Sequence, residues 1–455
     1  MSCTSNNATP PGPAIAPGVE SIDPAAVARR VGREGVDPRL RAILPAFDAP
    51  FFQAGLAGYS DAAMRIIARR HGCPFCVTEA LLDRTLLAGG RGFAKADLGE
   101  LHDNVPGGVE DHPLACQIMG SDPREMAASA LKVAEQGKRP PKHYRLIAYE
   151  NASPELLEEV RSQHLRTAGG QQIGRFDPTE GLGDSDNTLG DDSCDPLDHE
   201  TGGEGEYESS LGTAAPRHLD TSFEVIDINL ACPVKKIKAK ARGGHWLTEP
   251  AGAIKILEAV REAVPAKTPC TLKLRRSYDD TPEMVENFET IFDAAYAMGY
   301  SWATVHARTV EQKYIGPSRW TFLQDLVRRH PDKVIFGSGD VWDVNDIFRM
   351  IGYTGVSGVS VARGCIGNPW IFRQARQMMA GEAPAAPTIA EQRAVLEEHF
   401  RLSVTVNGEG LASRLMRKFA IRFAAHHPDG ETVRREFIRV ESIVDWRGVL
   451  ERHYG

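Results

Sequence analysis

Short apolar runs alternate with amphipathic stretches from Pro50 to about residue 370. Eight runs rich in Val, Ile, Leu and Phe are typical of buried parallel strands. They cover residues 51–55, 74–79, 113–118, 223–228, 269–274, 301–305, 333–337 and 357–361. Apolar residues three or four apart predict helices after most of them, over residues 60–71, 121–136, 248–264, 281–298 and 341–351. Eight strand–helix units predict the α/β class and a (β/α)8 barrel, or TIM barrel, over residues 46–375.

A doubly wound open sheet is the competing architecture for this alternation. Its nucleotide-binding members carry a G-x-G-x-x-G motif directly after the first strand, and no such motif follows the first run here. The barrel is therefore favoured, and its functional groups are expected at the C-terminal ends of the strands.

Three segments depart from the alternation of strands and helices. Residues 1–45 are rich in Pro, Ala and Gly at their start, which predicts a disordered N-terminal extension. Residues 138–221 interrupt the barrel as a largely disordered acidic insertion, with a short helix predicted over 154–165. Residues 385–455 show only helical periodicity, which predicts a small all-helical C-terminal domain of three or four helices.

Composition and cysteine spacing narrow the class of protein. Hydrophobic residues make up 42% of the chain and charged residues 25%, as in ordinary globular proteins. No apolar run approaches the roughly 20 residues of a membrane span, and the N-terminus lacks the pattern of a secretory signal. The eight cysteines show no framework spacing, so we expect reduced thiols in a cytoplasmic protein. Cys73 and Cys76 form a CxxC without a second ligand pair, so buried thiols are expected and no metal.

The net charge of −8 is unevenly distributed. Between Phe176 and Glu208 the chain has twelve Asp or Glu and no Lys or Arg, and the remainder carries a formal charge of +4. The acidic segment is either a solvated loop without function or a regulatory segment that masks a basic face. Four cations in the C-terminal segment lie three or four residues apart, on one helix face that is either solvated or in contact with nucleic acid. These are Arg414, Arg417, Lys418 and Arg422.

A thiol follows the fourth predicted strand in the sequence FEVIDINLACPVKKIKAKARGGHWL. The strand stops at Asn229, and Cys232 follows three residues later. Five cations come next: Lys235, Lys236, Lys238, Lys240 and Arg242. A thiol at the rim of a barrel beside a cationic loop indicates an acid catalyst that faces a polyanion.

Polar side chains also end several other predicted strands. Gln117 ends the third strand, Lys273 the fifth and His306 the sixth. The seventh and eighth strands run into the glycine-containing loops 337–340 and 362–364, where barrels commonly hold phosphate. Each residue alone could be structural, but together they favour a phosphorylated cofactor over the barrel mouth. For flavin mononucleotide (FMN), Lys273 and Gln117 would face the pyrimidine edge of the ring.

At this point the motifs resemble those of the tRNA-dihydrouridine synthases of bacteria, an FMN-dependent family. The matching segments are GLAGYSDAAMR, VTEAL, CQIMGSDP, IDINLACPVKKIKAKARGG, LKLR, VHARTVEQKYIGPSRW, FGSGDV, GVSVARGCIGNPWIF and, in the helical domain, LMRKFAIRF. The resemblance extends from about Pro50 to Phe372, apart from the insertion. Three positions depart from the family pattern: Gly55-Leu56 replaces Pro-Met, Ala231 replaces Gly, and Ser338 replaces Asn.

The resemblance implies an enzyme that uses FMN and NADPH to reduce the C5–C6 double bond of uridine in tRNA. It implies that Cys232 is the general acid, a role that suits a thiol of ordinary pKa, about 8.5. The implied cofactor-binding residues are Gly55, Leu56, Ala57, Gln117, Lys273, His306, Ser338, Gly339, Asp340, Ala362 and Arg363. The expected tRNA contacts are Asn229, Lys235, Lys236, Lys238, Arg242, Arg308, Arg417 and Lys418. We expect a monomer whose C-terminal helices bind tRNA.

Two other functions stay open at this point. One is a flavin barrel that reduces a free pyrimidine, which would need neither the basic loop nor the C-terminal helices. The other is a catalytically silent tRNA-binding protein that helps tRNA to fold. The presence of Cys232, Lys273 and His306 argues against loss of the reaction.

Overall fold

The barrel prediction is confirmed. The computed structural model describes residues 17–88, 108–136, 138–166, 172–179, 223–233 and 243–455. Eight parallel strands follow one another around a closed barrel, and β1 pairs with β11 while β2 pairs with β4. They are β1 (Phe51–Gln53), β2 (Cys76–Val77), β4 (Leu114–Met119), β7 (Val225–Leu230), β8 (Cys270–Arg275), β9 (Trp302–His306), β10 (Ile335–Ser338) and β11 (Gly358–Val361). A two-residue strand, β3 (Leu81–Leu82), extends the β4 edge.

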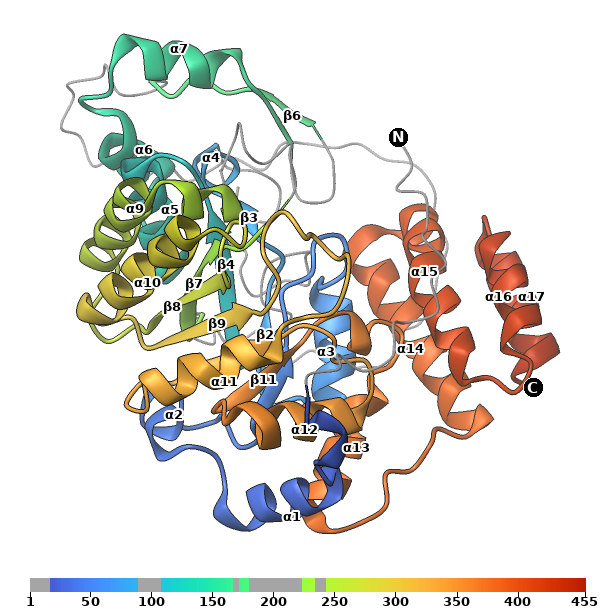
Figure 1. Cartoon of the computed structure of the whole chain (residues 1–455). Coiled ribbons are helices and arrows are strands. Elements are labelled where there is room, and N and C mark those ends of the chain that lie inside the picture. The colour runs from blue at the N-terminus through green and yellow to red at the C-terminus, as the bar shows by residue number, and fades with distance from the viewer. Residues whose placement is uncertain (1–16, 89–107, 137, 167–171, 180–222, 234–242) are drawn as a thin grey trace, which may run out of the picture.

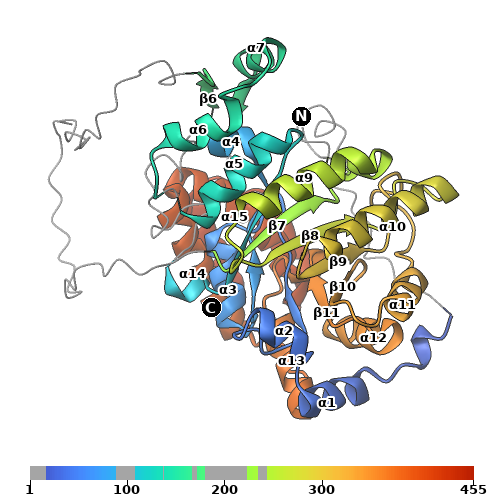
Figure 2. The same ribbon diagram turned by 90° about the vertical axis from the view of Figure 1, so that its left-hand side faces the viewer.

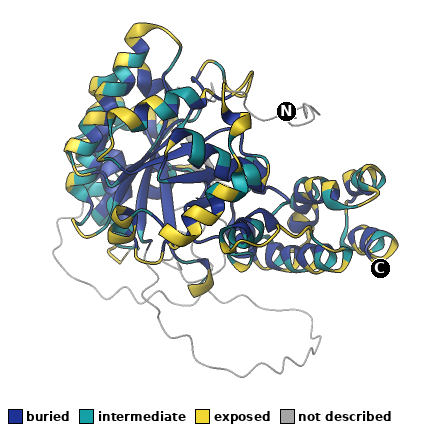
Figure 3. Ribbon diagram, turned by 60° about the horizontal axis from the view of Figure 1, so that its bottom comes forward, coloured by how far each residue is buried: buried dark blue, intermediate teal, exposed yellow. Residues whose placement is uncertain are grey.

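Helices surround these strands, and their outward faces are exposed (Figures 1 and 3). They are α3 (Ala62–Arg70), α4 (Asp83–Leu87), α5 (Pro123–Ala134), α9 (Pro250–Ala263), α10 (Pro282–Ala297), α11 (Trp320–Arg329), α12 (Val344–Thr354) and α13 (Trp370–Ala380). Figure 2 shows β7 to β11 in sequence, with α9 to α12 on their outer side. Several helices begin at an acidic N-cap residue. At the start of α5, Asp122 precedes Pro123, and the Asp122 carboxylate accepts hydrogen bonds from the backbone N–H groups of Arg124 and Glu125.

The N-terminal segment is folded where the structure describes it, so the predicted disorder up to residue 45 is wrong there. It forms α1 (Pro24–Glu34) and α2 (Pro38–Ile43), each with an aspartate N-cap before a proline. Gly32 lets α1 pack closely on α13, since a Cβ there would lie 2.1 Å from the Met379 carbonyl oxygen. Leu40 and Phe47 pack with Phe52 and other barrel-lining side chains. This segment therefore closes the end of the barrel opposite the pocket described below.

The insertion is also partly folded. Its predicted helix corresponds to α7 (Pro154–Ser162), but α6 (Pro141–Tyr149) and the hairpin β5 (His164–Arg166) and β6 (Gln172–Arg175) were expected to be disordered. Tyr149 of α6 packs in a small apolar cluster with residues of α4, α5 and α7. Arg84 of α4 is buried and donates to both Glu125 and Glu159, which ties α5 and α7 together. Residues 180–222, which include most of the acidic run, lie outside the described residues.

Four helices follow the barrel, within the range predicted for the C-terminal segment: α14 (Ile389–Asn407), α15 (Glu409–Phe423), α16 (Gly430–Ile438) and α17 (Ile443–His453). Figure 1 shows α14 and α15 on the side of α3, with α16 and α17 farther from the barrel. Arg70 of α3 forms an ion pair with Glu398 of α14, and the Tyr59 ring packs edge-on against Phe419 of α15. Among the described residues, no helix has both the length and the apolar character needed to span a bilayer.

Candidate active site

A pocket opens at the C-terminal ends of the barrel strands and encloses about 970 Å³, including its mouth. All eleven residues predicted to bind the cofactor line this pocket: Gly55, Leu56, Ala57, Gln117, Lys273, His306, Ser338, Gly339, Asp340, Ala362 and Arg363. They come from six strands or from the loops that follow them. Because the carboxyl ends of parallel strands meet at one rim, side chains far apart in the sequence become neighbours.

Cys232 lies in the wall of the same pocket and is half-buried. The Asn229 side-chain oxygen holds its turn by accepting from the N–H groups of Ala231 (2.9 Å) and Cys232 (3.2 Å). The Cys232 carbonyl accepts from the N–H of Gly244 at 2.9 Å. Asn229 was predicted to contact tRNA, whereas its amide is buried in the pocket wall and organises this turn.

A chain of hydrogen bonds runs beneath the pocket from β8 to the Cys232 turn. The Thr271 hydroxyl donates to one Asp227 oxygen at 2.6 Å, and Gln117 Nε2 donates to the other at 2.7 Å. Asn229 Nδ2 then donates to Gln117 Oε1 at 2.7 Å. Burial raises the pKa of Asp227, while the hydrogen bonds from Thr271 and Gln117 oppose that shift. All four side chains are at most 7% exposed.

Cations gather on β8, the strand next to β7, and in the loop after β11. Burial lowers the pKa of Lys273, whose ammonium forms no hydrogen bond or ion pair within the described part of the chain. Burial also lowers the pKa of Arg275 to about 10 and the pKa of Arg363 below its ordinary value. The Arg363 guanidinium lies between two aromatic rings, 4.9 Å from the centre of Tyr314 and 4.5 Å from that of Trp342. This wall is suited to an anionic ligand.

His306 is a neutral hydrogen-bond donor in this setting. Burial, followed by the charges of nearby lysine and arginine side chains, lowers its pKa well below the ordinary value. Its Nδ1 accepts from the backbone N–H of Arg308 at 3.2 Å, so the ring proton resides on Nε2. A neutral imidazole with this tautomer can donate one hydrogen bond to an acceptor in the pocket.

Tight turns shape the loops after β1, β10 and β11. Gly339 has φ +114°, and a Cβ there would lie 2.3 Å from Ser318 Oγ. A Cβ on Gly55, where the family pattern has proline, would lie 2.3 Å from the Thr78 carbonyl oxygen. After β11, the 3-10 turn Arg363–Cys365 begins without a side-chain cap on its first N–H groups. Both phosphate-loop candidates thus present backbone at the pocket wall.

Arg308 does not lie where it was predicted. Its side chain is fully buried, and its guanidinium donates to both Asp340 oxygens at 2.7 Å and to the Gly316 carbonyl at 2.6 Å. The backbone N–H of Ser318 donates to the same carboxylate at 2.7 Å. Arg308 therefore braces the loop of residues 316–318 against the β10 loop, and a tRNA contact is excluded by its burial.

The cations of α15 differ in their contacts with the barrel. Lys418 donates to the Gly58 carbonyl, and its ammonium lies 4.8 Å from the centre of the Tyr59 ring, so it joins the helical region to the loop after β1. Arg417 is half-buried, and Arg414 and Arg422 are exposed. Lys235, Lys236, Lys238 and Arg242 of the cationic loop lie outside the described residues.

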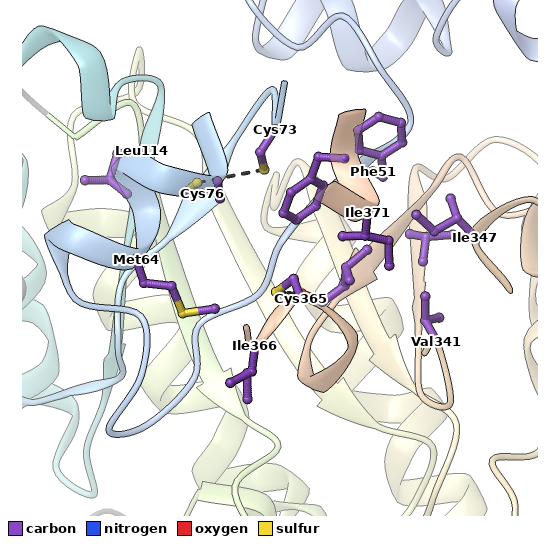
Figure 4. Close-up of a cluster of buried hydrophobic side chains, with 14 of the residues drawn as sticks. Phe51, Met64, Cys73, Cys76, Leu114, Val341, Ile347, Cys365, Ile366 and Ile371 are labelled. Atoms are coloured by element: carbon purple, nitrogen blue, oxygen red, sulfur yellow. Dashed lines mark hydrogen bonds between the residues drawn. The ribbon is translucent and has the colours of Figure 1, made fainter. Parts of the chain in front are cut away.

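The CxxC cysteines are buried thiols, as predicted. Figure 4 shows Cys73 and Cys76 side by side near Cys365, among apolar side chains. The sulfur atoms of Cys73 and Cys76 are 3.9 Å apart. Within the described ranges, no group of three or more His, Cys, Asp or Glu is arranged to hold a metal ion.

Several residues in or beneath the pocket were missed in the sequence. Arg275 is two positions after Lys273 on β8, and Asp227 is two positions before Asn229 on β7. Residues two apart on a strand face the same side, so the period of two could have identified both. Tyr314 and Trp342 lie in irregular loops, and no periodic signal places them at the mouth.

Similarity to known protein sequences identifies the family of this chain. The model of the dihydrouridine synthase (Dus) family matches residues 205–452, more than half of the chain. A probable tRNA-dihydrouridine synthase of Mycobacterium leprae (strain TN) is 31% identical over 247 residues, which cover 53% of this chain and 62% of that protein. The tRNA-dihydrouridine synthase B of Proteus vulgaris is 29% identical over 246 residues, covering 54% and 74%. A probable tRNA-dihydrouridine synthase of Treponema pallidum (strain Nichols) is 33% identical over 233 residues, covering 50% and 67%.

Proposed function

The chain belongs to the dihydrouridine synthase family, and from this premise we propose that it reduces the C5–C6 double bond of uridine in tRNA, with FMN as cofactor and NADPH as electron donor. One observation supports this proposal above all others. A half-buried thiol, Cys232, lines the same pocket as the cationic wall and the two glycine-containing loops. A proton donor and a set of groups that could bind an anionic cofactor therefore face one cavity.

The residues present fit a flavin phosphate. The Lys273 ammonium forms no hydrogen bond or ion pair with the described side chains, although it lies in the field of the Asp227 carboxylate. It would meet the pyrimidine edge of the ring, which becomes electron-rich on reduction. Gln117 would reach the same edge. His306 Nε2, Arg363 and the backbone of the loops after β10 and β11 would hold the phosphate. The Asp340 carboxylate at that end is paired with Arg308 and lies 3.8 Å from Arg363, so it would repel the phosphate less.

When bound and reduced, the flavin supplies the hydride that C6 of the uracil receives. The Cys232 thiol donates its proton to C5, and the two additions together saturate the C5–C6 bond. The thiolate that remains lies within the field of the Arg275 guanidinium, which stabilises it until it takes up a proton from water. Arg275 also donates to the Ala231 carbonyl at 3.0 Å, so the same cation holds the turn in place.

The tRNA would approach over the open mouth. The target base must leave its stack to reach a pocket of this depth, which favours a protein surface that holds the surrounding backbone. Arg414, Arg417 and Arg422 of α15 are candidates for phosphate contacts, together with the cationic loop that includes Lys235 and Lys236. We expect the alanine variant of both lysines to bind tRNA more weakly, and unchanged binding would exclude that loop from the interface.

We also propose a cytoplasmic monomer. The six described cysteines form no disulfide, and reduced thiols are typical of cytoplasmic proteins. Light scattering of the purified protein would test the monomer, because a dimer would double the measured mass.

The first test is the visible absorption spectrum of the purified protein, with mass identification of any released cofactor. FMN in the preparation would support the pocket assignment, and a protein that cannot be loaded with FMN would contradict it. Nucleoside analysis of tRNA incubated with enzyme and NADPH then tests the substrate. A flavoprotein that reduces only a free pyrimidine would refute the tRNA assignment.

The role of Cys232 is tested by Cys232→Ala, with Cys270→Ala as the matched control. Cys270 is a buried thiol at the start of β8, away from the pocket. We expect Cys232→Ala to lose dihydrouridine formation by about a hundredfold or more while it keeps FMN and tRNA binding. Full activity in Cys232→Ala would remove the thiol from the mechanism.

A further inference from the structure

A buried carboxylate beneath the pocket has no role in the steps described so far. Asp227 lies on β7, is 6% exposed, and accepts two short hydrogen bonds, from Thr271 at 2.6 Å and from Gln117 at 2.7 Å. It also borders a small cavity of about 260 Å³ shared with Lys273. A carboxylate buried at this depth is costly to the fold unless its hydrogen bonds are made, so its presence calls for an explanation beyond packing.

The direction of every hydrogen bond in this chain is determined by its two ends. An ionised Asp227 can only accept, so Gln117 must turn its NH₂ group toward it and its carbonyl oxygen toward Asn229. At the other end, the backbone N–H groups of Ala231 and Cys232 can only donate, so Asn229 must turn its oxygen toward them and its NH₂ group toward Gln117. The two requirements agree, and neither amide can flip without placing like groups face to face.

We propose that Asp227 is a positioning residue for the reaction, acting through Gln117 on the flavin ring and through Asn229 on the turn that carries Cys232. This inference rests on the proposed function. The remaining hydrogen-bonding capacity of the Gln117 amide faces the pocket, so Asp227 determines which group the cofactor meets. Asn229 transmits the same constraint to the Cys232 N–H at 3.2 Å, which ties the position of the acid to the orientation of the cofactor contact.

Three single variants separate positioning from packing. Asp227→Ala removes the acceptor for Gln117. Asp227→Asn can still offer its oxygen to Gln117 and its NH₂ group to the Thr271 hydroxyl, so orientation is kept and only the charge is lost. Thr271→Val removes one hydrogen bond to Asp227 but leaves the one to Gln117, and serves as the matched control for a disturbed buried network.

The readouts are FMN affinity by fluorescence titration, the absorption spectrum and reduction potential of the bound flavin, and the alkylation rate of Cys232 by peptide mapping. We expect Asp227→Ala to bind FMN about tenfold more weakly, with a shifted flavin spectrum and a several-fold change in Cys232 alkylation. Asp227→Asn should restore the affinity for FMN. The reduction potential of the flavin bound to this variant should rise, because a negative charge near the ring is lost. In Thr271→Val the FMN affinity and the Cys232 alkylation rate should stay within about twofold of those of the unmodified protein.

A compensating pair keeps the test decisive if Asp227→Ala does not fold. Gln117→Glu places two acceptors face to face and should alter the alkylation rate of Cys232. Adding Asp227→Asn to it restores complementarity, because the new amide donates to the new carboxylate while Asn229 still donates to it. Recovery of the alkylation rate in the double variant supports the relay, and equal rates in the single and double variants overturn it.

Failure of this inference can be distinguished from failure of the proposed function. If the unmodified protein binds FMN and Asp227→Ala binds it with the same affinity and spectrum, the positioning role is wrong and the enzyme assignment stands. If the unmodified protein binds no FMN, the proposed function fails. The alkylation rates then still decide whether Asp227 controls the Cys232 turn.

Discussion

The pair of Arg308 and Asp340 offers the sharpest test of the forces that shape the pocket. Both side chains are at most 1% exposed, and the carboxylate accepts from the arginine and from the Ser318 N–H. One Arg308 nitrogen, Nη1, has no hydrogen-bond partner among the described residues. Among the described residues, Asp340 is the carboxylate that pairs with this guanidinium. Its removal would leave a buried cation without compensation, which is among the most destabilising changes a core can undergo.

Asp340→Asn is the informative substitution, because residue 340 has φ +55° and Asn tolerates the left-handed region. It keeps the shape and one acceptor but removes the charge. Loss of a buried partner typically costs 3–5 kcal/mol, and the acceptor that Asn retains places our expectation at about 3 kcal/mol of unfolding free energy. Asp325→Asn is the control, since Asp325 and Arg328 pair at 3.7 Å with 65% and 69% of their side chains exposed. We expect about 0.5 kcal/mol or less there.

Urea unfolding followed by tryptophan fluorescence measures both variants. Trp320 is a suitable reporter, because its indole N–H donates to the Gly339 carbonyl at 3.0 Å, directly beside the pair. In an Arg308→Met background Asp340→Asn should cost little or even stabilise the protein, because it then removes a buried carboxylate that has lost its guanidinium partner. Equal costs for Asp340→Asn and Asp325→Asn, or the same cost in both backgrounds, would refute the reasoning.

Three further predictions concern the C-terminal helices. Burial lowers the pKa of His399 to about 3. Between pH 7 and 5 the unfolded chain therefore binds a proton that the native state does not bind, and the free energy of unfolding falls by about 2 kcal/mol. His399→Leu should flatten the plot of unfolding free energy, measured in urea, against pH over this range, and an unchanged slope would contradict the assignment. Lys418→Met removes the contact by which α15 is joined to the loop after β1. The helical region should then separate from the barrel more often, and the exposed linker over residues 381–386 should be cleaved faster by proteases. Arg414→Met should leave the rate of cleavage unchanged. The affinity for tRNA should fall with salt, and Arg417→Ala should reduce the slope of log K against log salt by about one; an unchanged slope would exclude Arg417 from the interface.

The barrel could be predicted because its strands are buried on both faces. Such strands read as continuous apolar runs, and the residue that ends each run lies at the rim, so Gln117, Lys273 and His306 could be assigned to one site without any contact information. The same reasoning failed for Arg308, since charge and position identify a cation but not its partner. Asp340 lies 32 residues further along the chain, and only the fold brings it within reach.

The N-terminal prediction failed for a different reason. The Pro- and Gly-rich composition of the first residues was extended to a segment whose local signals point the other way. Asp23-Pro24 and Asp37-Pro38 are each an N-cap followed by proline at the first helical position, and apolar residues such as Leu40 follow at helical spacing. Helix-capping residues therefore predict the structure of residues 17–45 better than the average composition of residues 1–45, which combines the Pro- and Gly-rich start with this helical part.

The cations of the pocket connect fold and function. Burial lowers the pKa of Lys273, Arg275 and Arg363, so each is held in a setting that disfavours its charged form. The carboxylate of Asp340 lies 3.8 Å from Arg363, but it is shared with Arg308. The positive charge is therefore only partly compensated where the glycine-containing loops expose their backbone, and a phosphate there would compensate it further. A ligand at a hundred times its Kd stabilises the native state by about 2.7 kcal/mol, so the fold would recover through the cofactor part of the stability that burial of these cations costs.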